Sequence, residues 1–110
     1  GLRRRIEHHL ELAQRFSAWV DEAPDWERLA PVPFSTVCFR WAPGDGVLDA
    51  VALDERNAAI MDAVNRTGEV FLSHTRLAGR FAIRIAIGNL RTEERHVARA
   101  WELLQEAADA

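Results

Sequence analysis

Apolar residues recur with two different periods along this chain, and each period predicts one kind of element. Between residues 2 and 22 they return every three or four positions, which is the spacing of one face of an amphipathic helix. Pro24 predicts the end of that helix. The expected apolar face carries Leu2, Ile6, Leu10, Ala13, Phe16 and Val20, with Leu12 and Trp19 on its flank.

Two further helices are predicted from their end signals. Asp54 is a favourable N-cap for a helix that ends at Gly68, a residue type suited to the position just after a helix. Thr92 is the expected cap of the last helix, and Glu93 and Glu94 favour its positive end. The expected buried residues are Ile60, Met61 and Val64 in the first of these helices and Val97, Trp101, Leu104 and Ala108 in the second.

Strict alternation of apolar and polar residues predicts a strand at Thr36–Trp41. A shorter extended piece is expected at 26–30. Pro31 and Pro33 follow it and lack the N–H that a central strand must donate, so this piece is predicted to be an edge strand.

A β-hairpin is predicted from Glu69–Thr75 and Arg80–Ile87, with its turn near Ala78 and Gly79. The second arm is the clearest strand in the chain, because its two faces differ completely. One face carries Phe81, Ile83, Ile85 and Ile87, and the other carries Arg80, Ala82, Arg84 and Ala86.

The predicted order of elements is α-β-β-α-β-β-α in one domain covering residues 1–110. Strands joined by hairpins form antiparallel sheets, and the isoleucine face of the second hairpin arm requires a cover. We therefore expect an α+β two-layer sandwich, with a three- or four-stranded antiparallel sheet and three helices on one face.

In the middle of the central strand, the other face of this sheet carries a single arginine, Arg84, flanked by the small residues Ala82 and Ala86. A solvated face normally carries several long polar side chains, so this pattern favours a surface that another body covers. Leu12 and Trp19 are expected to extend that surface. The alternative is that Arg84 is a solvated arginine and that the alanines are neutral.

Composition removes several classes of function. The net charge of -3 gives no electrostatic support for nucleic-acid binding, and no apolar run is long enough to cross a membrane. The single cysteine, Cys38, excludes an internal disulfide and fits a reducing compartment, so a cytoplasmic location is expected. All 14 residues counted as lysine plus arginine are arginine.

The remaining candidate residues favour structural interpretations. His74 and Thr75 end the first hairpin arm, where the histidine is expected to be a surface or hydrogen-bonding residue and not a catalytic one. His8 and His9 point about 100° apart on a helix and do not form a chelate. His96 has no second ligand at credible spacing, and Cys38 has no evident base partner. No metal site is predicted.

Three stretches cover nearly the whole chain in a specific order and spacing. They read LELAQRFSAWV at 10–20, LAPVPFSTVCFRW at 29–41, and DERNAAIMDAVNRTGEVFLSHTRLAGRFAIRIAIGNLRTEERHVARAWELL at 54–104. Together they resemble the carboxy-terminal small domain of group II pyridoxal-phosphate-dependent decarboxylases, the aromatic-L-amino-acid decarboxylase family.

The resemblance implies a decarboxylase that converts an L-amino acid, with aromatic amino acids expected first, to an amine and carbon dioxide. In that family pyridoxal phosphate is bound by a large domain of the same polypeptide, on a lysine that forms a Schiff base. This chain has no lysine. We therefore expect it to be an excised part of a larger enzyme, covering the active site but inactive alone and holding no cofactor.

The resemblance also places an arginine of the F-x-I-R-I-A-I strand near the substrate carboxylate. The matching residue here is Arg84, which is the one expected substrate-binding residue. The full-length enzyme is expected to be a homodimer. Two alternatives stay open, a free-standing ferredoxin-like ligand-binding or regulatory module and a structural module that dimerises through the 82–86 strand.

Overall fold

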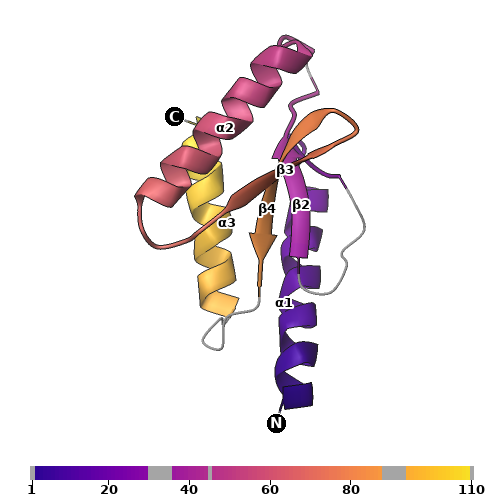
Figure 1. Ribbon diagram of the computed structural model, residues 1–110, viewed down its shortest axis with the longest axis vertical. Helices are drawn as coiled ribbons and strands as arrows, with labels where there is room; N and C mark the ends of the chain where they lie inside the picture. The colour runs from indigo at the N-terminus through magenta and orange to yellow at the C-terminus, as the bar shows by residue number, and fades with distance from the viewer. Residues whose placement is uncertain (1, 30–35, 45, 88–93, 110) are drawn as a thin grey trace.

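The computed structural model describes residues 2–29, 36–44, 46–87 and 94–109. The elements are α1 (Leu2–Glu22), β1 (Trp26–Arg28), β2 (Thr36–Trp41), α2 (Ala50–Arg66), β3 (Ser73–Leu77), β4 (Arg80–Ala86) and α3 (Glu94–Asp109) (Figure 1). The four strands form one antiparallel sheet in the order β1-β2-β4-β3, so β1 and β3 are its edges.

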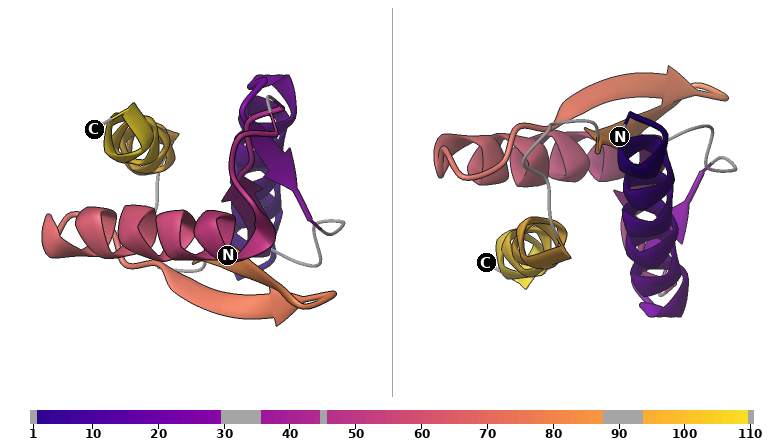
Figure 2. Two further views of the ribbon diagram at one scale, coloured as in Figure 1. Left: turned by 90° about the horizontal axis from the view of Figure 1, so that it is seen from above. Right: turned by 90° about the horizontal axis from the view of Figure 1, so that it is seen from below.

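The three helices lie on one side of a curved sheet, which confirms the predicted two-layer α+β architecture (Figure 2). Helix α1 packs against β1 and β2, and α2 packs against β4. Ile83, Ile85 and Ile87 are buried beneath the helices, as the alternation predicted. Burying each such side chain contributes about 1.5–3 kcal/mol, so this face supplies much of the stability.

An aromatic cluster joins α1 to the sheet and to α3. The Phe16 ring lies 5.1 Å from that of Phe39 and 5.7 Å from that of Trp101, measured between centroids. Trp26 packs edge-on against Trp101 at 5.2 Å. Leu12 belongs to the same core and is 2% exposed, so its predicted place on a partner-facing surface is wrong. The buried face of α1 is therefore wider than the apolar face predicted from the sequence.

Helix α2 begins earlier than predicted. Its N-cap is Asp49, whose side-chain oxygen accepts a hydrogen bond from the Ala52 amide at 2.8 Å. Asp54 lies inside the helix and is not the cap, because no residue between them interrupts helical propensity. Its carboxylate instead accepts from the Phe81 amide at 3.0 Å and from Arg76 at 3.2 Å. Gly68 does follow the helix end, with φ of 74°.

Two asparagines of α2 bind main chain outside the helix. Asn57 is fully buried and pairs with both the N–H and the C=O of Trp41, at 2.7 and 2.9 Å. Asn65 pairs in the same way with Leu72, at 2.7 and 3.0 Å. These contacts hold the end of β2 and the approach to β3 against the helix, and each satisfies polar groups whose burial would otherwise be costly.

The hairpin turns at Ala78 and Gly79, as predicted. Both have positive φ, 53° and 78°, the combination found in a type I′ turn between twisted strands. The first arm begins at Ser73 and not at Glu69, because Asn65 takes the main-chain groups of Leu72. The predicted cap Thr92 and its neighbour Glu93 lie outside the described residues.

Candidate functional site

Arg84 lies in the middle of β4 and is exposed on the sheet face opposite the helices. Its directly opposed neighbours are Ser73 on β3 and Cys38 on β2, and opposed residues in a ladder place their side chains on the same face. Ser73, Arg84 and Cys38 therefore form a row across three strands, which we call the Arg84 row.

A hydroxyl holds the guanidinium of Arg84. Its Nε donates a hydrogen bond to Ser73 Oγ at 3.1 Å. The other arginines of the described strands lie within salt-bridge distance of a carboxylate. These pairs are Arg28 with Asp21, Arg40 and Arg80 with Glu27, and Arg76 with Asp54. In the described part of the sheet, Arg84 is thus the arginine whose charge no carboxylate offsets.

Cys38 is half-buried beside this charge. Burial raises the pKa of its thiol, and the positive charge of Arg84 opposes that rise. Because burial is the larger effect, the thiol stays protonated at neutral pH and is a poor nucleophile. The row therefore offers one permanent positive charge and two neutral polar groups.

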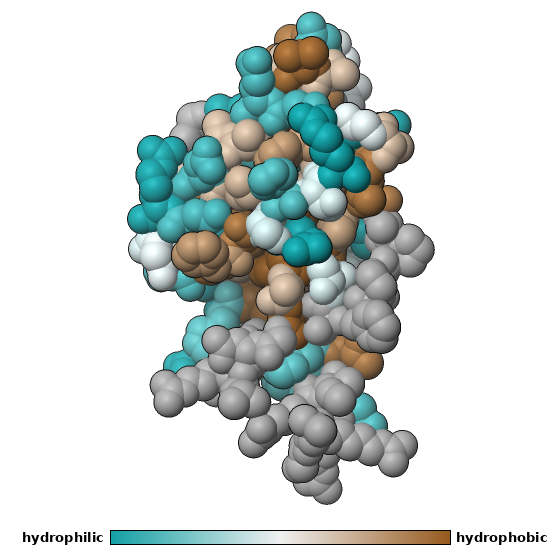
Figure 3. All heavy atoms as spheres, in the orientation of Figure 1, coloured by the Kyte–Doolittle hydropathy of each residue, from teal (hydrophilic) through white to brown (hydrophobic). Residues whose placement is uncertain are grey.

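The face around Arg84 is not uniformly open. Ala82 has no exposed surface although it lies outside the helix-side core, and the Arg40 side chain is only 11% exposed beside Glu27. Arg84 and Ala86, by contrast, are exposed. The space-filling view of this side shows hydrophilic and hydrophobic side chains interspersed (Figure 3). Of the sheet surface that the sequence predicted to face a partner, the part around Arg84 and Ala86 is thus accessible.

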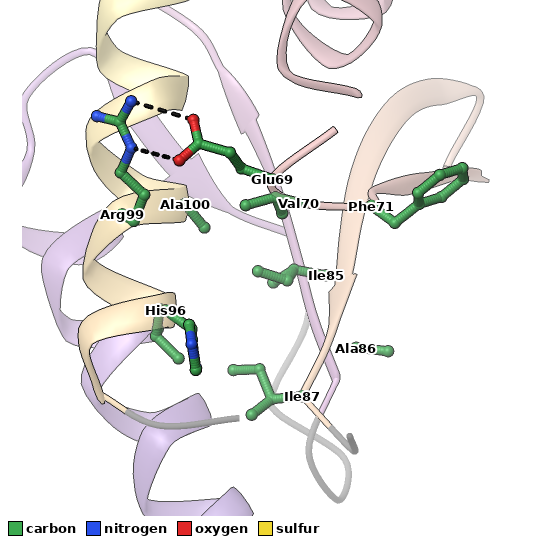
Figure 4. Close-up of a pocket in the computed structure, with 10 residues that line it drawn as sticks. Glu69, Val70, Phe71, Ile85, Ala86, Ile87, His96, Arg99 and Ala100 are labelled. Carbon is green, nitrogen blue, oxygen red and sulfur yellow. Dashed lines mark hydrogen bonds and ion pairs between the residues drawn. The ribbon is translucent and has the colours of Figure 1, made fainter. Parts of the chain in front are cut away.

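A cleft of about 380 Å³ lies elsewhere, between the 69–71 segment, the end of β4 and the first turns of α3 (Figure 4). Its floor is apolar and includes Ile85, Ile87 and Val97. Arg99 crosses its rim to Glu69 with two hydrogen bonds of 3.1 and 3.3 Å. These bonds raise the pKa of Arg99 and offset its charge, so the cleft offers a closed ion pair above apolar side chains.

The histidines occupy separate parts of the described structure. His74 stacks on Phe81 with ring centroids 5.0 Å apart, a packing role that the sequence did not predict. His8 and His9 have ring centroids 6.2 Å apart, and His96 is on the rim of the cleft. Among the residues that the structure describes, no group of three or more His, Cys, Asp or Glu side chains is placed to hold a metal ion.

The chain does not fit a pyridoxal phosphate site by itself. It has no lysine to form a Schiff base. The starts of α2 and α3 are also unfavourable for a phosphate, since Asp49 caps α2 with a carboxylate and Glu94 occupies the first turn of α3. By themselves, the residues of this chain therefore do not supply the cofactor chemistry.

Among the described helices, none is long and apolar enough to span a membrane.

No family model matches the chain, but curated proteins do. It is 45% identical over 108 residues to tyrosine decarboxylase 2 of Arabidopsis thaliana, covering 98% of this chain and 19% of that protein. It is 40% identical to phenylacetaldehyde synthase of the same plant, covering 97% and 21%. It is 39% identical to tryptophan decarboxylase TDC1 of Camptotheca acuminata, covering 99% and 22%. The chain spans about a fifth of the length of these relatives.

Solved structures agree in fold. The structure of Oryza sativa TDC with PLP and tryptamine superposes with a TM-score of 0.92 at 34% identity, covering 98% of this chain and 23% of that one. Catharanthus roseus tryptophan decarboxylase in complex with L-tryptophan gives a TM-score of 0.89 at 36% identity, covering 98% and 22%. The matched part is the small carboxy-terminal region of these decarboxylases.

Proposed function

Since this chain belongs to the pyridoxal-phosphate-dependent aromatic amino-acid decarboxylases and matches only their carboxy-terminal part, we propose that it is the small domain of such an enzyme. The whole enzyme would release carbon dioxide from an aromatic L-amino acid and yield an amine. Relatives named for tyrosine and tryptophan support an aromatic substrate. This domain would cover the active site, and the rest of the polypeptide would hold the cofactor.

Arg84 is the residue that we propose for substrate binding. The observation that carries this role is that no carboxylate of the described residues pairs with Arg84. The other described strand arginines have carboxylate partners, while Arg84 is exposed and bonded to a hydroxyl. A guanidinium offers a carboxylate two parallel hydrogen bonds. Such a contact would orient the substrate carboxylate before it departs, which is a positioning task.

The decisive experiment is Arg84→Ala in the full-length enzyme. We expect kcat/KM to fall roughly tenfold or more, since a charge-assisted hydrogen bond contributes about 1.5–3 kcal/mol. Arg76→Ala is the matched control, because Arg76 lies on the neighbouring strand and pairs with Asp54 of α2. The control should leave kcat/KM within twofold. An Arg84→Ala enzyme with unchanged kcat/KM would remove Arg84 from the site.

The isolated chain should be inactive alone. Supplied with pyridoxal phosphate and an aromatic amino acid, it should form no amine and develop no visible absorbance of a lysine-bound cofactor, because it has no lysine. Either signal would contradict the proposal. The partners we propose are the large domain of the same polypeptide and, in the full-length enzyme, a second copy. The single cysteine supports a cytoplasmic setting.

A second candidate reaction concerns the product. The relative named phenylacetaldehyde synthase is 40% identical, so an enzyme that ends at an aldehyde is also consistent with this domain. In such an enzyme too, Arg84 would hold the carboxylate of an amino-acid substrate. Analysis of the product of the full-length enzyme as amine or aldehyde separates the two reactions.

A standalone module that dimerises through 82–86 would instead give a tight dimer of the isolated chain in light scattering.

A further inference from the structure

Ser73 and Arg84 oppose each other in the β3–β4 ladder, and their side chains emerge on the same face. The hydrogen bond between them runs from Arg84 Nε to Ser73 Oγ over 3.1 Å. Both residues are exposed. Within the described residues, this hydroxyl is the hydrogen-bond partner of the guanidinium, so it is the group that restricts where the guanidinium can point.

The nitrogen used in this bond decides what Arg84 can still offer. A guanidinium has one N–H on Nε and four on its two terminal nitrogens. A hydrogen bond at Nε to Ser73 restricts the orientation of the guanidinium plane. The two terminal nitrogens remain able to donate a pair of parallel hydrogen bonds to a carboxylate. Because the side chain is already held, less conformational entropy is lost when a ligand binds.

We propose that Ser73 is a positioning residue that holds Arg84 for the substrate carboxylate. The inference deepens the proposed function and depends on the carboxylate contact of Arg84. Ser73 itself needs no contact with the substrate. Ser73 contributes to the affinity for ligands that carry a carboxylate. A ligand without a carboxylate does not bind the guanidinium that Ser73 orients, so its affinity does not depend on Ser73.

The test is Ser73→Ala in the full-length enzyme, with two readouts. The KM for the amino acid should rise about three- to tenfold, the size expected for losing one ordinary solvent-exposed hydrogen bond within the protein. The inhibition constant of the product amine, which has no carboxylate, should stay within twofold. A merely structural role for Ser73 would weaken both ligands together and would overturn the proposal.

Three further variants sharpen the test. Ser73→Thr keeps a hydroxyl at the same position and should restore the KM. Thr75→Val removes a hydroxyl from β3 one alternation further along, opposite Ala82, and should leave the KM unchanged. In an Arg84→Ala background, Ser73→Ala should add no further loss, since it acts through the guanidinium.

The outcomes distinguish this inference from the proposed function. If Arg84→Ala lowers kcat/KM and Ser73→Ala does not raise the KM, the positioning role is overturned and the carboxylate contact stands. If neither variant changes kcat/KM, both are overturned. If Ser73→Ala raises the KM and Ser73→Thr restores it, with the amine unaffected, the positioning role is supported.

Discussion

At the scale of single residues, Cys38 reports on the charge of Arg84. Burial raises the pKa of the thiol and Arg84 lowers it. We predict that the pH profile of Cys38 alkylation in the isolated chain has its midpoint above the ordinary range of a cysteine, since the thiolate is the reactive form. Arg84→Ala should move that midpoint further upward, because the opposing effect is removed.

The control for this measurement is Arg76→Ala, which removes an equal charge that does not act on Cys38. Its midpoint should match that of the unmodified chain. A downward shift in Arg84→Ala would contradict the arrangement of the Arg84 row. The same raised pKa implies that stability is fully present below the pKa of the unfolded thiol and declines as pH rises toward that of the folded thiol, because the unfolded chain ionises first.

Single residues also show where sequence patterns stop being informative. Judged from the local sequence, Asp49 and Asp54 are both acceptable N-caps. Asp49 caps the helix, whereas the carboxylate of Asp54 accepts a hydrogen bond from the Phe81 amide of the hairpin. Asn57 looks like an ordinary helix residue in the sequence, yet it is fully buried and bound to Trp41. Such roles depend on partners 16 to 27 positions away, which local periodicity does not contain.

At the scale of elements, the hairpin turn contains a residue under strain. Ala78 has φ of 53°, a region that a side chain with Cβ rarely adopts and that asparagine and glycine tolerate better. We predict that Ala78→Asn stabilises the isolated chain by about 0.5–1 kcal/mol, because it creates the Asn-Gly sequence preferred in type I′ turns. Urea unfolding followed by circular dichroism measures this change.

The matched control is Ala59→Asn, the same substitution at an exposed position inside α2. There asparagine should destabilise by about 0.5 kcal/mol, since it is a poorer helix former than alanine. If the substitution raises the free energy of unfolding at position 78 and lowers it at position 59, the backbone conformation of each position is the cause. A loss of stability in Ala78→Asn would show that the turn is not the type I′ turn described.

The order and type of the seven elements that the structure describes could be predicted from the sequence, because α1, β2 and β4 have clear periods and α2 and α3 have clear end signals. The hairpin turn was also predictable, since Ala78-Gly79 separates two alternating runs. The start of β3 was not, because Asn65 binds Leu72 from another element and shortens the strand. Boundaries set by tertiary contacts are therefore the part that pattern reading misses.

At the scale of the whole molecule, the place of Arg84 was predictable but its setting was not. Alternation along β4 put it opposite the isoleucines, and its exposure agrees with that placement. The hydrogen bond to Ser73 and the carboxylate partners of the other strand arginines emerge only when four strands are assembled. Its role toward a substrate stays a prediction.

The whole molecule is also expected to unfold as one unit, and Phe16 is the residue that tests this. Its fully buried ring contacts Phe39 of β2 and Trp101 of α3, so it connects the first helix to the sheet and to the last helix. Phe16→Ala should lower the free energy of unfolding by about 3–5 kcal/mol, the cost of an aromatic cavity. That is a large fraction of the stability of a domain of this size.

Native-state hydrogen exchange on the isolated chain separates cooperative from local loss. If the core is one unit, Phe16→Ala should accelerate exchange of the slowest amides in β2, β4 and α3 as well as in α1, because all of them open through global unfolding. Phe16→Leu, which fills most of the cavity, should produce a smaller change in the same amides. Faster exchange confined to α1 would mean that this helix detaches alone, and that β2, β4 and α3 hold together without it.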